Sequence, residues 1–488
     1  MNILFASSEV EPFAKVGGLG DVAAALPRRL AELGHDVRVV MPYYGKVQRG
    51  GYPVEEVLPD VRFGMGPHEV RFGVLRGTLP DSSVPVYFIR CSRLYDGPSV
   101  YGSGPEEALR FGVLNWAALV LCQHLGFAPD VVHVNDWQTS LVPVMLRSVF
   151  AWDRLFERTR TVLTIHNMGH QGTFEASALG EVGLASAVHL LHQDALREGR
   201  FGFLQTGLMH ANAITTVSPT YAREIQTPEH GVGLDGTLRN RGDVLFGILN
   251  GIDEHAWNPA TDPHLPAHFS ADDLRGKAVC RSRLLAEVGL PEYVNVPVAG
   301  IVSRLVWQKG FDLVMQVLPD LLRRQPLQVV VLGTGEPQFE GFFRALAAHF
   351  PRQVAFVSKF SEPLAHRIEA GSDLFLMPSR YEPCGLNQLY SLQYGTPPVV
   401  HRTGGLADSV WPVDTHRDQG TGFVFDHFDA AGFRWATEAA LATWGDGQGE
   451  ARARWERLQR RGMRLPLGWS HRAQRYVEVY RLVAPEGR

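Results

Sequence analysis

One turn of the chain combines a carboxylate with the start of a helix. Glu382 lies in the run Pro378-Ser-Arg-Tyr-Glu-Pro-Cys-Gly-Leu-Asn, between an apolar stretch typical of a buried strand and a stretch typical of a helix. The proline after Glu382 disfavours a helical conformation in the residue before it, so the carboxylate is expected outside the helix. The N–H groups of Gly385, Leu386 and Asn387 would then open a helix whose positive end attracts anions. A nucleotide sugar needs both features.

Two cations lie on another loop that follows an apolar strand. In Ser303-Arg-Leu-Val-Trp-Gln-Lys-Gly, Arg304 can grip phosphate oxygens as a fork, and Lys309 adds a compact charge. The pair fits a diphosphate, although a solvated surface charge is the commoner role of each residue type.

A glycine-rich segment, Lys15-Val-Gly-Gly-Leu-Gly-Asp, follows the first apolar run. Glycine lets a backbone approach a phosphate closely, so Lys15 and Gly18 are candidates for phosphate or sugar contact; a turn needed only for packing is the alternative. The pattern Gly-x-Gly-x-x-Ala from Gly18 also fits a dinucleotide fingerprint. The long connection from the strand and the lack of an acidic residue after the second strand argue against NAD.

Asp136 and His166 each follow an apolar strand at its carboxyl end, where ligands bind in parallel sheets. Both are candidate site residues. The local alternatives are a helix cap for Asp136 and a buried, hydrogen-bonded core histidine for His166. No Asp-x-Asp pair occurs in the sequence. This predicts that no divalent metal holds the ligand and that arginine, lysine and helix ends neutralise its phosphates.

The composition is that of a globular protein without a polyanionic partner. The 488 residues are 45% hydrophobic and 20% charged, and the formal net charge of −4 favours neither nucleic acid nor an anionic membrane. Four scattered cysteines without a C-x-x-C pair indicate a reducing compartment. The first residues lack a signal-peptide pattern, and the apolar run 116–122 is too short to span a bilayer. We therefore expect a cytoplasmic protein with no membrane partner.

Short apolar runs alternate with helical patterns along nearly the whole chain, which predicts parallel sheets covered by helices on both faces. A Pro- and His-rich passage, 257–269, separates two such series, and the capping-box spacing at Ser270 predicts a helix from there to about Val288. Two doubly wound α/β domains would hold a ligand in the cleft between them. The predicted divisions are an N-terminal domain at 1–252, a linker and helix at 253–296, a C-terminal domain at 297–466 and a C-terminal helix at 467–488.

Six motifs, in order, resemble those of bacterial glycogen synthases and plant starch synthases. They are Lys15-Val-Gly-Gly-Leu-Gly-Asp, Asn135-Asp-Trp-Gln, Thr164-Ile-His-Asn, Ser303-Arg-Leu-Val-Trp-Gln-Lys-Gly, Ser379-Arg-Tyr-Glu-Pro-Cys-Gly-Leu and Arg402-Thr-Gly-Gly-Leu-Ala-Asp. The resemblance covers nearly the whole chain. It implies a GT-B fold, in which two Rossmann-like domains face a deep interdomain cleft and the C-terminal helix crosses back onto the N-terminal domain. It also implies retaining transfer of glucose from ADP-glucose to the non-reducing end of an α-1,4-glucan.

The resemblance implies roles for individual residues as well. Glu382 and His166 are expected to hold the donor glucose, with Asp136 near the reacting carbon. Tyr95 and Asn167 match positions associated with the acceptor glucan. No metal or other cofactor is implied, and the sequence carries no signal for an oligomeric state. The other donor contacts are assigned to Lys15, Gly18, Arg304, Lys309, Phe360, Cys384, Gly385, Leu386 and Asn387.

Three positions refine this picture. Lys359-Phe360 stands where the family commonly has Gly-Tyr, so Phe360 can stack on the base but lacks the hydroxyl. Tyr390 stands where related enzymes often carry a second glutamate, which favours the synthase branch. Cys384 is expected to be a small donor-site residue and not a nucleophile.

The alternative function is a related GT-B glucosyltransferase that uses UDP-glucose or a small sugar-phosphate acceptor. Retention is compatible with a covalent intermediate or with same-face attack.

Overall fold

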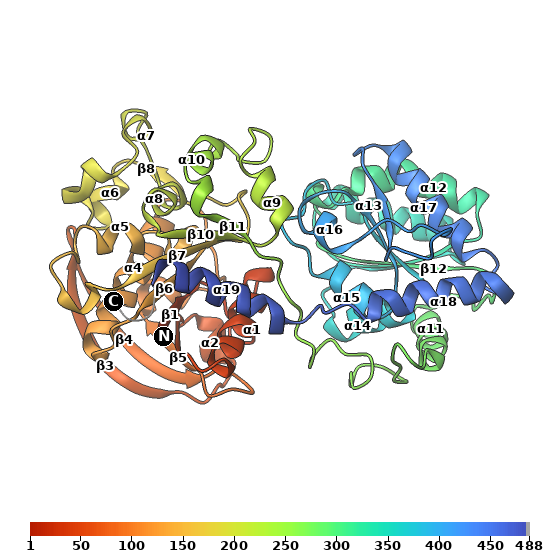
Figure 1. The fold of residues 1–488 in the computed structure, drawn as a ribbon, viewed down its shortest axis with the longest axis horizontal. Coiled ribbons are helices and arrows are strands. Elements are labelled where there is room, and N and C mark those ends of the chain that lie inside the picture. The colour runs from red at the N-terminus through yellow and green to blue at the C-terminus, as the bar shows by residue number, and fades with distance from the viewer. Residues whose placement is uncertain (485–488) are drawn as a thin grey trace. The chain divides into compact units, whose positions relative to one another are not determined.

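The computed structural model describes residues 1–484, and the chain forms two compact units. Unit 1 is Met1–Asn250 together with the chain from Trp469 onward, and unit 2 is Gly251–Gly468 (Figure 1). The segment 253–296, separated in the sequence analysis as a linker and helix, is part of unit 2. Helix α19 (Trp469–Val483) is part of unit 1, and positions 485–488 of the predicted C-terminal segment lie outside the described residues.

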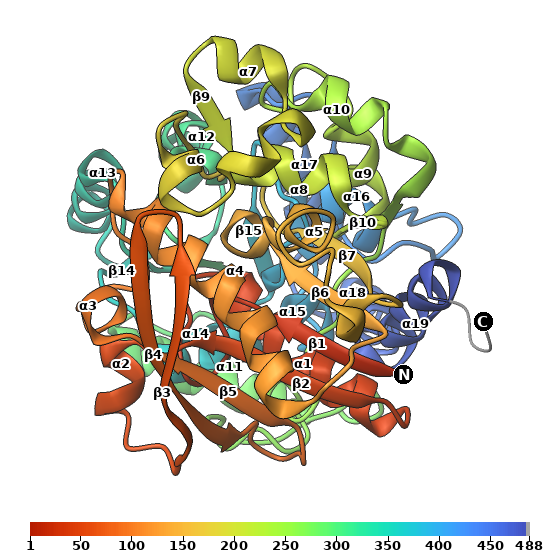
Figure 2. The ribbon, with the colours of Figure 1, turned by 90° about the vertical axis from the view of Figure 1, so that its left-hand side faces the viewer.

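Unit 1 is built on a nine-stranded sheet that is parallel except at one edge. In order across the sheet its strands are β11 (Leu245–Gly247), β10 (Ala213–Thr216), β7 (Arg160–Ile165), β6 (Val131–Asn135), β1 (Asn2–Ala6), β2 (Asp36–Pro42), β5 (Pro85–Arg90), β4 (His68–Thr78) and β3 (Glu55–Met65). The β3–β4 hairpin pairs antiparallel at the edge of the sheet (Figure 2). The sequence analysis missed this hairpin because its largely exposed β3 lacks the apolar run of a buried strand.

Helices pack on this sheet. Helix α4 (Glu106–Leu125) is the one helix among residues 1–484 that is long and apolar enough to cross a membrane, but 72% of its apolar window is buried inside the protein, as in a core helix. Helix α1 (Gly18–Glu32) continues through Pro27 without a break. Helix α19 packs against α1 (Figure 1). The Tyr480 hydroxyl of α19 lies 2.6 Å from Nδ1 of the fully buried His133, so this helix is tied to the core of unit 1.

The remaining elements of unit 1 are short. They are α2 (Gly45–Arg49), α3 (Ser92–Tyr95), α5 (Val142–Leu146), α6 (Ala178–Glu181), α7 (Gln193–Arg197), α8 (Phe203–His210), α9 (Pro219–Glu224), α10 (Asp235–Arg239) and the hairpin of β8 (Thr173–Glu175) with β9 (Arg200–Gly202).

Unit 2 is built on a six-stranded sheet whose strands are all parallel. In order they are β14 (Val354–Val357), β13 (Gln328–Leu332), β12 (Val298–Val302), β15 (Leu374–Met377), β16 (Pro398–His401) and β17 (Phe423–Phe425). Helices α12 (Phe311–Arg324), α13 (Pro337–His349) and α17 (Ala430–Trp444) cover one face. Helices α11 (Arg275–Val288), α14 (Glu362–Gly371) and α15 (Asn387–Gln393) cover the other (Figure 1). Helices α16 (Gly404–Ser409) and α18 (Gly449–Met463) complete the unit.

Two predicted helix starts were wrong. Helix α11 begins at Arg275, because Ser270 accepts hydrogen bonds from the N–H groups of Asp272 and Asp273 in a turn that ends before the helix. Helix α15 begins at Asn387, because Gly385 has a φ of +72°, which lies outside the helical region.

Among its parallel strands, each sheet has one switch point, from which the chain continues to opposite sides. In unit 1 it lies between β1 and β6, and in unit 2 it lies between β12 and β15. Loops that leave the carboxyl ends of two such strands turn toward opposite faces of the sheet and leave a crevice in which ligands bind. Each unit therefore has one topologically favoured position for a site.

Candidate active site

In unit 2 the loops that follow β12 and β15 bring Lys309 and Glu382 together. Lys309 ends a 3-10 helix, Trp307–Lys309, and its Nζ lies 2.5 Å from Oε2 of Glu382. The Ser379 hydroxyl donates to the same carboxylate oxygen at 2.9 Å. The Glu382 side chain is 7% exposed and that of Lys309 is 18% exposed, so this is a largely buried ion pair at the switch point.

Backbone contacts fix the relative position of the two loops. Gly310, directly after Lys309, has a φ of +74°, and a Cβ at this position would lie 1.9 Å from the carbonyl oxygen of Pro378. The N–H of Arg380 donates to the carbonyl of Gln308 at 2.9 Å. Only glycine permits both this backbone conformation and this close approach, which explains the Lys-Gly pair at the end of the motif.

A third segment supports the Glu382 turn from behind. Helix α16 begins at Gly404, and the N–H of Gly405 donates to the carbonyl of Glu382 at 3.0 Å. A Cβ on Gly404 would lie 2.0 Å from that same carbonyl oxygen. The Arg402-Thr-Gly-Gly motif thus packs directly against the backbone of the Glu382 turn.

Arg304 and the start of α15 offer further groups for an anion. Arg304 is exposed, and it forms no ion pair with any residue in the described range 1–484. Asn387 is the first residue of α15, and its side-chain amide donates to the carbonyl of Val302 at 2.5 Å, which ties the helix start to the end of β12. Leu386 is the N-cap of α15. The first N–H groups of any helix have no partner within the helix.

The two remaining donor predictions of unit 2 differ in exposure. Cys384 is buried beside the glycines of α16; a Cβ on Gly405 would lie 2.0 Å from its carbonyl oxygen. Phe360 lies after β14 and is 86% exposed, so its ring is available for stacking.

In unit 1 a buried carboxylate that the sequence analysis missed holds the glycine-rich loop. Oε2 of Glu9 accepts hydrogen bonds from the N–H groups of Val16 at 2.6 Å and Gly17 at 2.9 Å, and Oε1 accepts one from the Tyr101 hydroxyl. Glu9 is 4% exposed. The polar run Ser7-Ser-Glu directly after the apolar β1 was the available signal, since polar residues at a strand exit face the switch point.

The loop held by Glu9 leads into the predicted phosphate contacts of unit 1. Gly18 is the first residue of α1, and Lys15 precedes it. Lys15 Nζ lies 2.6 Å from Oδ1 of Asp21, and its side chain is 38% exposed, so its charge is shared with a carboxylate of the first helical turn.

Asp136 lies directly after β6 with a φ of +54°, an uncommon conformation for a residue other than glycine. Its Oδ1 accepts a hydrogen bond from the N–H of His166 at 2.7 Å. Burial raises the pKa of Asp136 to about 7, and hydrogen bonds from the N–H groups of His166 and Asn167 oppose that rise. The helix-cap alternative is wrong, because the carboxylate forms no cap hydrogen bond with the 3-10 helix that follows.

The His166 ring is held in a neutral form. Its Nε2 lies 3.0 Å from Oδ1 of Asn135, whose amide nitrogen donates to the carbonyl of Ala6. The oxygen of Asn135 is therefore turned toward the ring, which makes Nε2–H of His166 the donor. Burial lowers the pKa of His166 to about 3, although part of the residue remains accessible to solvent. A neutral imidazole at a strand end can exchange hydrogen bonds with hydroxyl groups.

The two residues predicted to contact the acceptor, Tyr95 and Asn167, differ in their burial. Tyr95 is fully buried, and its hydroxyl donates to the carbonyl of Arg110 at 2.7 Å. A side chain without exposed surface offers no contact to a glucan, so Tyr95 supports the loops from within. Asn167 follows His166 and is half-buried; its side-chain oxygen accepts a hydrogen bond from the N–H of Gly169.

Two Rossmann-like units, with cations, carboxylates and a neutral histidine at their switch points, define a glycosyltransferase of the GT-B class. Residues 2–240 match the starch synthase catalytic domain, and residues 287–461 match the glycosyl transferases group 1 family. The chain belongs to the glycogen and starch synthase family. The glycogen synthase of Anaeromyxobacter dehalogenans (strain 2CP-C) is 47% identical over 490 residues, covering 99% of this chain and 100% of the relative. That of Thermotoga maritima is 43% identical over 489 residues, covering 99% and 98%.

Solved structures agree with this family. The catalytic domain of starch synthase IV from Arabidopsis thaliana, bound to ADP and acarbose, has a TM-score of 0.90 at 34% identity and covers 99% of each chain. Sucrose-phosphate synthase from Thermosynechococcus elongatus, with a TM-score of 0.60 at 17% identity over 99% of this chain and 98% of that one, shares the fold. The family and the GT-B fold expected from the sequence are confirmed.

Proposed function

We propose that this protein transfers glucose from ADP-glucose to the non-reducing end of an α-1,4-glucan, with retention at the anomeric carbon. Its full-length relatives are glycogen synthases, which identifies glucan synthesis as the activity. The choice of ADP-glucose is supported by the starch synthase IV neighbour, which was solved bound to ADP and acarbose.

The observation that carries the proposal is the Lys309–Glu382 pair at the switch point of unit 2, with the exposed Arg304 on the same loop as Lys309. Departure of a nucleoside diphosphate builds negative charge on phosphate oxygens and positive charge on the sugar carbon. Fixed cations stabilise the first charge, and a positioned carboxylate stabilises the second or orients the sugar hydroxyls. In our proposal Arg304, Lys309 and the first N–H groups of α15 hold the diphosphate, and Glu382 holds the glucose.

The groups of unit 1 complete the proposal. We assign Lys15 and Gly18 to the donor phosphates, His166 to a glucose hydroxyl and Asp136 to the neighbourhood of the reacting carbon. Because His166 is neutral, it can donate or accept a hydrogen bond without adding charge. Asn167 is assigned to the acceptor. Glu9 is a positioning residue that keeps the Lys15 loop in place through the N–H groups of Val16 and Gly17.

We also propose that the reaction needs no metal and takes place in the cytoplasm. No group of three or more His, Cys, Asp or Glu side chains with metal-site geometry occurs among residues 1–484. The cytoplasmic part of the proposal rests on the four scattered cysteines without a C-x-x-C pair, a pattern typical of a reducing compartment. If the metal proposal is right, EDTA will leave the initial rate unchanged; a loss that added Mg²⁺ or Mn²⁺ restores would refute it.

The donor and the acceptor are tested together. Labelled ADP-glucose and UDP-glucose are each offered with glycogen and, separately, with glucose 1-phosphate as acceptor. We expect glycogen to be extended from ADP-glucose. Faster extension from UDP-glucose would establish the alternative donor, and transfer to glucose 1-phosphate alone would establish the alternative acceptor. Digestion of the product by an α-1,4-specific exoglucosidase checks the stereochemistry, because an inverted linkage would resist it.

A further inference from the structure

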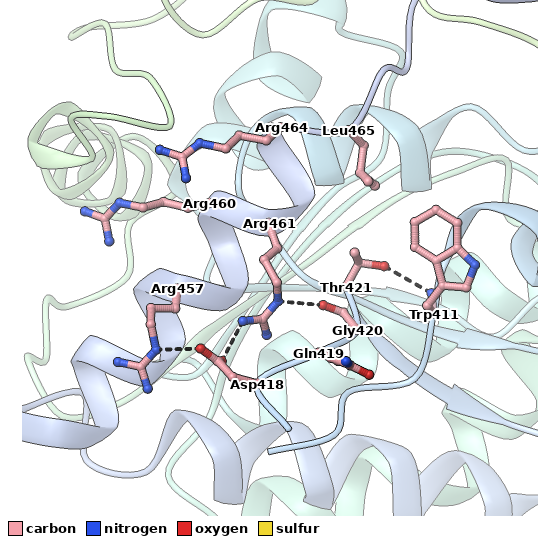
Figure 3. A pocket seen from close by; sticks show the side chains of 10 residues that line it. All are labelled: Trp411, Asp418, Gln419, Gly420, Thr421, Arg457, Arg460, Arg461, Arg464 and Leu465. Carbon is pink, nitrogen blue, oxygen red and sulfur yellow. Dashed lines mark hydrogen bonds and ion pairs between the residues drawn. The ribbon is translucent and has the colours of Figure 1, made fainter. Parts of the chain in front are cut away.

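A hollow of about 740 Å³ in unit 2 has four arginines among its ten lining residues (Figure 3). Arg457, Arg460 and Arg461 lie on α18, and Arg464 lies directly after it. They face the loop 411–421, which joins α16 to β17. None of these residues belongs to the glycosyl-transfer site proposed above.

Two of the arginines converge on one carboxylate of that loop. Nε of Arg457 lies 2.9 Å from Oδ2 of Asp418, and Nη1 of Arg461 lies 2.6 Å from Oδ1 of the same residue. Nε of Arg461 also donates to the carbonyl of Gly420 at 2.9 Å. Figure 3 shows these contacts between the helix and the loop. The Arg457 and Arg461 guanidinium groups therefore lie where a single anion accepts hydrogen bonds from both.

Arg460 and Arg464 extend to the rim, where they reach the carbonyl of Ala271 and the carboxylate of Asp272. Arg460 also pairs with Glu456 at 3.1 Å and Arg464 pairs with Asp272 at 2.8 Å, so these two charges are balanced. The excess positive charge of the hollow therefore lies at Arg457 and Arg461, which share the single carboxylate of Asp418. Such a local excess of positive charge attracts anions.

The opposite wall is apolar. Trp411 is 48% exposed and lies beside Leu465 in the lining, and its backbone is fixed by the hydrogen bond from its N–H to the Thr421 hydroxyl at 3.0 Å. An aromatic face beside arginine forks is the combination that holds a phosphate together with an attached ring, because the forks chelate the phosphate oxygens and the ring stacks on the indole. The volume is that of a small-molecule pocket.

We propose that this hollow is a second ligand site, which binds a small phosphate monoester. The phosphate would occupy the position of the Asp418 carboxylate between Arg457 and Arg461, and the attached sugar or nucleoside would stack on Trp411. Asp418 acts as an internal competitor: the hydrogen bonds from Arg461 and Arg457 lower its pKa, so it carries its charge at neutral pH.

Titration calorimetry of the full chain at low ionic strength tests the proposal with inorganic phosphate, glucose 1-phosphate and AMP. We expect Arg457→Ala to weaken binding of the organic phosphates about ten-fold, the usual effect of losing a charge-assisted hydrogen bond. Asp418→Asn should tighten binding, because it removes the competing charge. Arg344→Ala is the control: Arg344 is an exposed arginine on α13 of the same unit, it pairs with Glu340 outside the hollow, and its loss should leave binding unchanged.

Two further variants test where the organic group of the ligand binds and whether the measured binding takes place at the proposed donor site instead. Trp411→Ala should remove the advantage of glucose 1-phosphate or AMP over inorganic phosphate. Lys309→Ala should leave binding at the hollow intact. The proposal is overturned if no probe binds, if organic phosphates bind no better than inorganic phosphate, if Asp418→Asn weakens binding, or if binding depends on Lys309 and not on Arg457. The better ligand of glucose 1-phosphate and AMP identifies the organic group.

Discussion

Replacement of Lys309 by methionine tests whether the Lys309–Glu382 pair is a structural as well as a catalytic unit. Among residues 1–484, the substitution leaves the Glu382 carboxylate, 7% exposed, with only the Ser379 hydroxyl as its side-chain donor at 2.9 Å. Removing one partner of a fully buried ion pair costs about 3–5 kcal/mol. Because Lys309 is 18% exposed and water can reach the carboxylate, we expect about 2–3 kcal/mol of lost unfolding free energy.

The companion variant, Glu382→Gln, is expected to cost less, about 1 kcal/mol, since a lysine left alone can turn its flexible chain toward solvent. The double variant Lys309→Met/Glu382→Gln should then be more stable than Lys309→Met alone. Its coupling energy should be about 1.5–2 kcal/mol in a double-mutant cycle, in the range of directly contacting residues. For a domain of this size, Lys309→Met should lower the calorimetric midpoint of unit 2 by about 4–12 °C.

Activity should respond differently from stability. Each single variant removes a group that we assign to the transition state, so each should lower kcat/KM about a hundred-fold or more. The double variant should regain stability and no activity. Additive stability losses would refute the coupling, and a recovery of activity in the double variant would refute the catalytic assignments. Lys359→Met, an exposed lysine of the same unit, is the control for stability and should leave the midpoint unchanged.

Three other predictions concern single groups. The Asp136 carboxyl has a raised pKa of about 7 in the folded protein, so it contributes stability that is full below pH 4 and is lost as pH rises to 7, at up to about 1.4 kcal/mol per pH unit. Asp136→Asn should remove this pH dependence of the unfolding free energy in urea titrations. The same variant should also remove an acid limb near pH 7 from the pH profile of kcat/KM. The pKa values of His133 and His166 are both lowered to about 3, so these residues reduce the stability of the folded protein as pH falls from about 6.5 to 3. Replacing either histidine with glutamine should therefore reduce the acid-induced loss of stability in this range. An unchanged loss would contradict their burial in the neutral form. Gly310→Ala should lower the unfolding free energy by more than about 2 kcal/mol and raise the KM for the donor, because its Cβ would lie 1.9 Å from the Pro378 carbonyl oxygen. Gly341→Ala is the control, because the space around this position of α13 is open, and it should leave the unfolding free energy unchanged or raise it. Similar effects of the two variants in chemical denaturation would refute the steric argument.

The strands that carry the site could be predicted from the sequence because they are apolar runs followed by polar residues or proline. β1, β6, β12 and β15 are all of this kind; candidate site residues were identified after β6, β12 and β15, whereas the polar run directly after β1 was missed. The β3–β4 hairpin gave no such signal, because an edge ribbon with an exposed strand does not need an apolar run.

Contacts between distant segments could not be predicted. Lys309 and Glu382 are 73 positions apart, and they meet because β12 and β15 are neighbours at the switch point. Strand order is not written in the local pattern of either strand. The same holds for Glu9, whose partners in its own loop are seven and eight positions away but whose third partner, Tyr101, is 92 positions away. Tyr95 was expected to contact the acceptor because it matches a family position, but its burial depends on contacts with distant segments and could not be predicted from the sequence.

The Lys309–Glu382 pair of unit 2 and the Asp136–His166 pair of unit 1 differ in electrostatic character. Unit 2 presents an ion pair and an exposed arginine at its switch point. In unit 1, burial favours the neutral forms of His166 and, below about pH 7, of Asp136. Charged groups fit a leaving diphosphate, and neutral hydrogen-bonding groups fit the hydroxyls of a sugar. If this division is correct, raising the salt concentration should weaken donor binding much more than it weakens glucan binding, because screening acts on the charged set alone. An equal salt dependence of the two KM values would show that both substrates depend on charge.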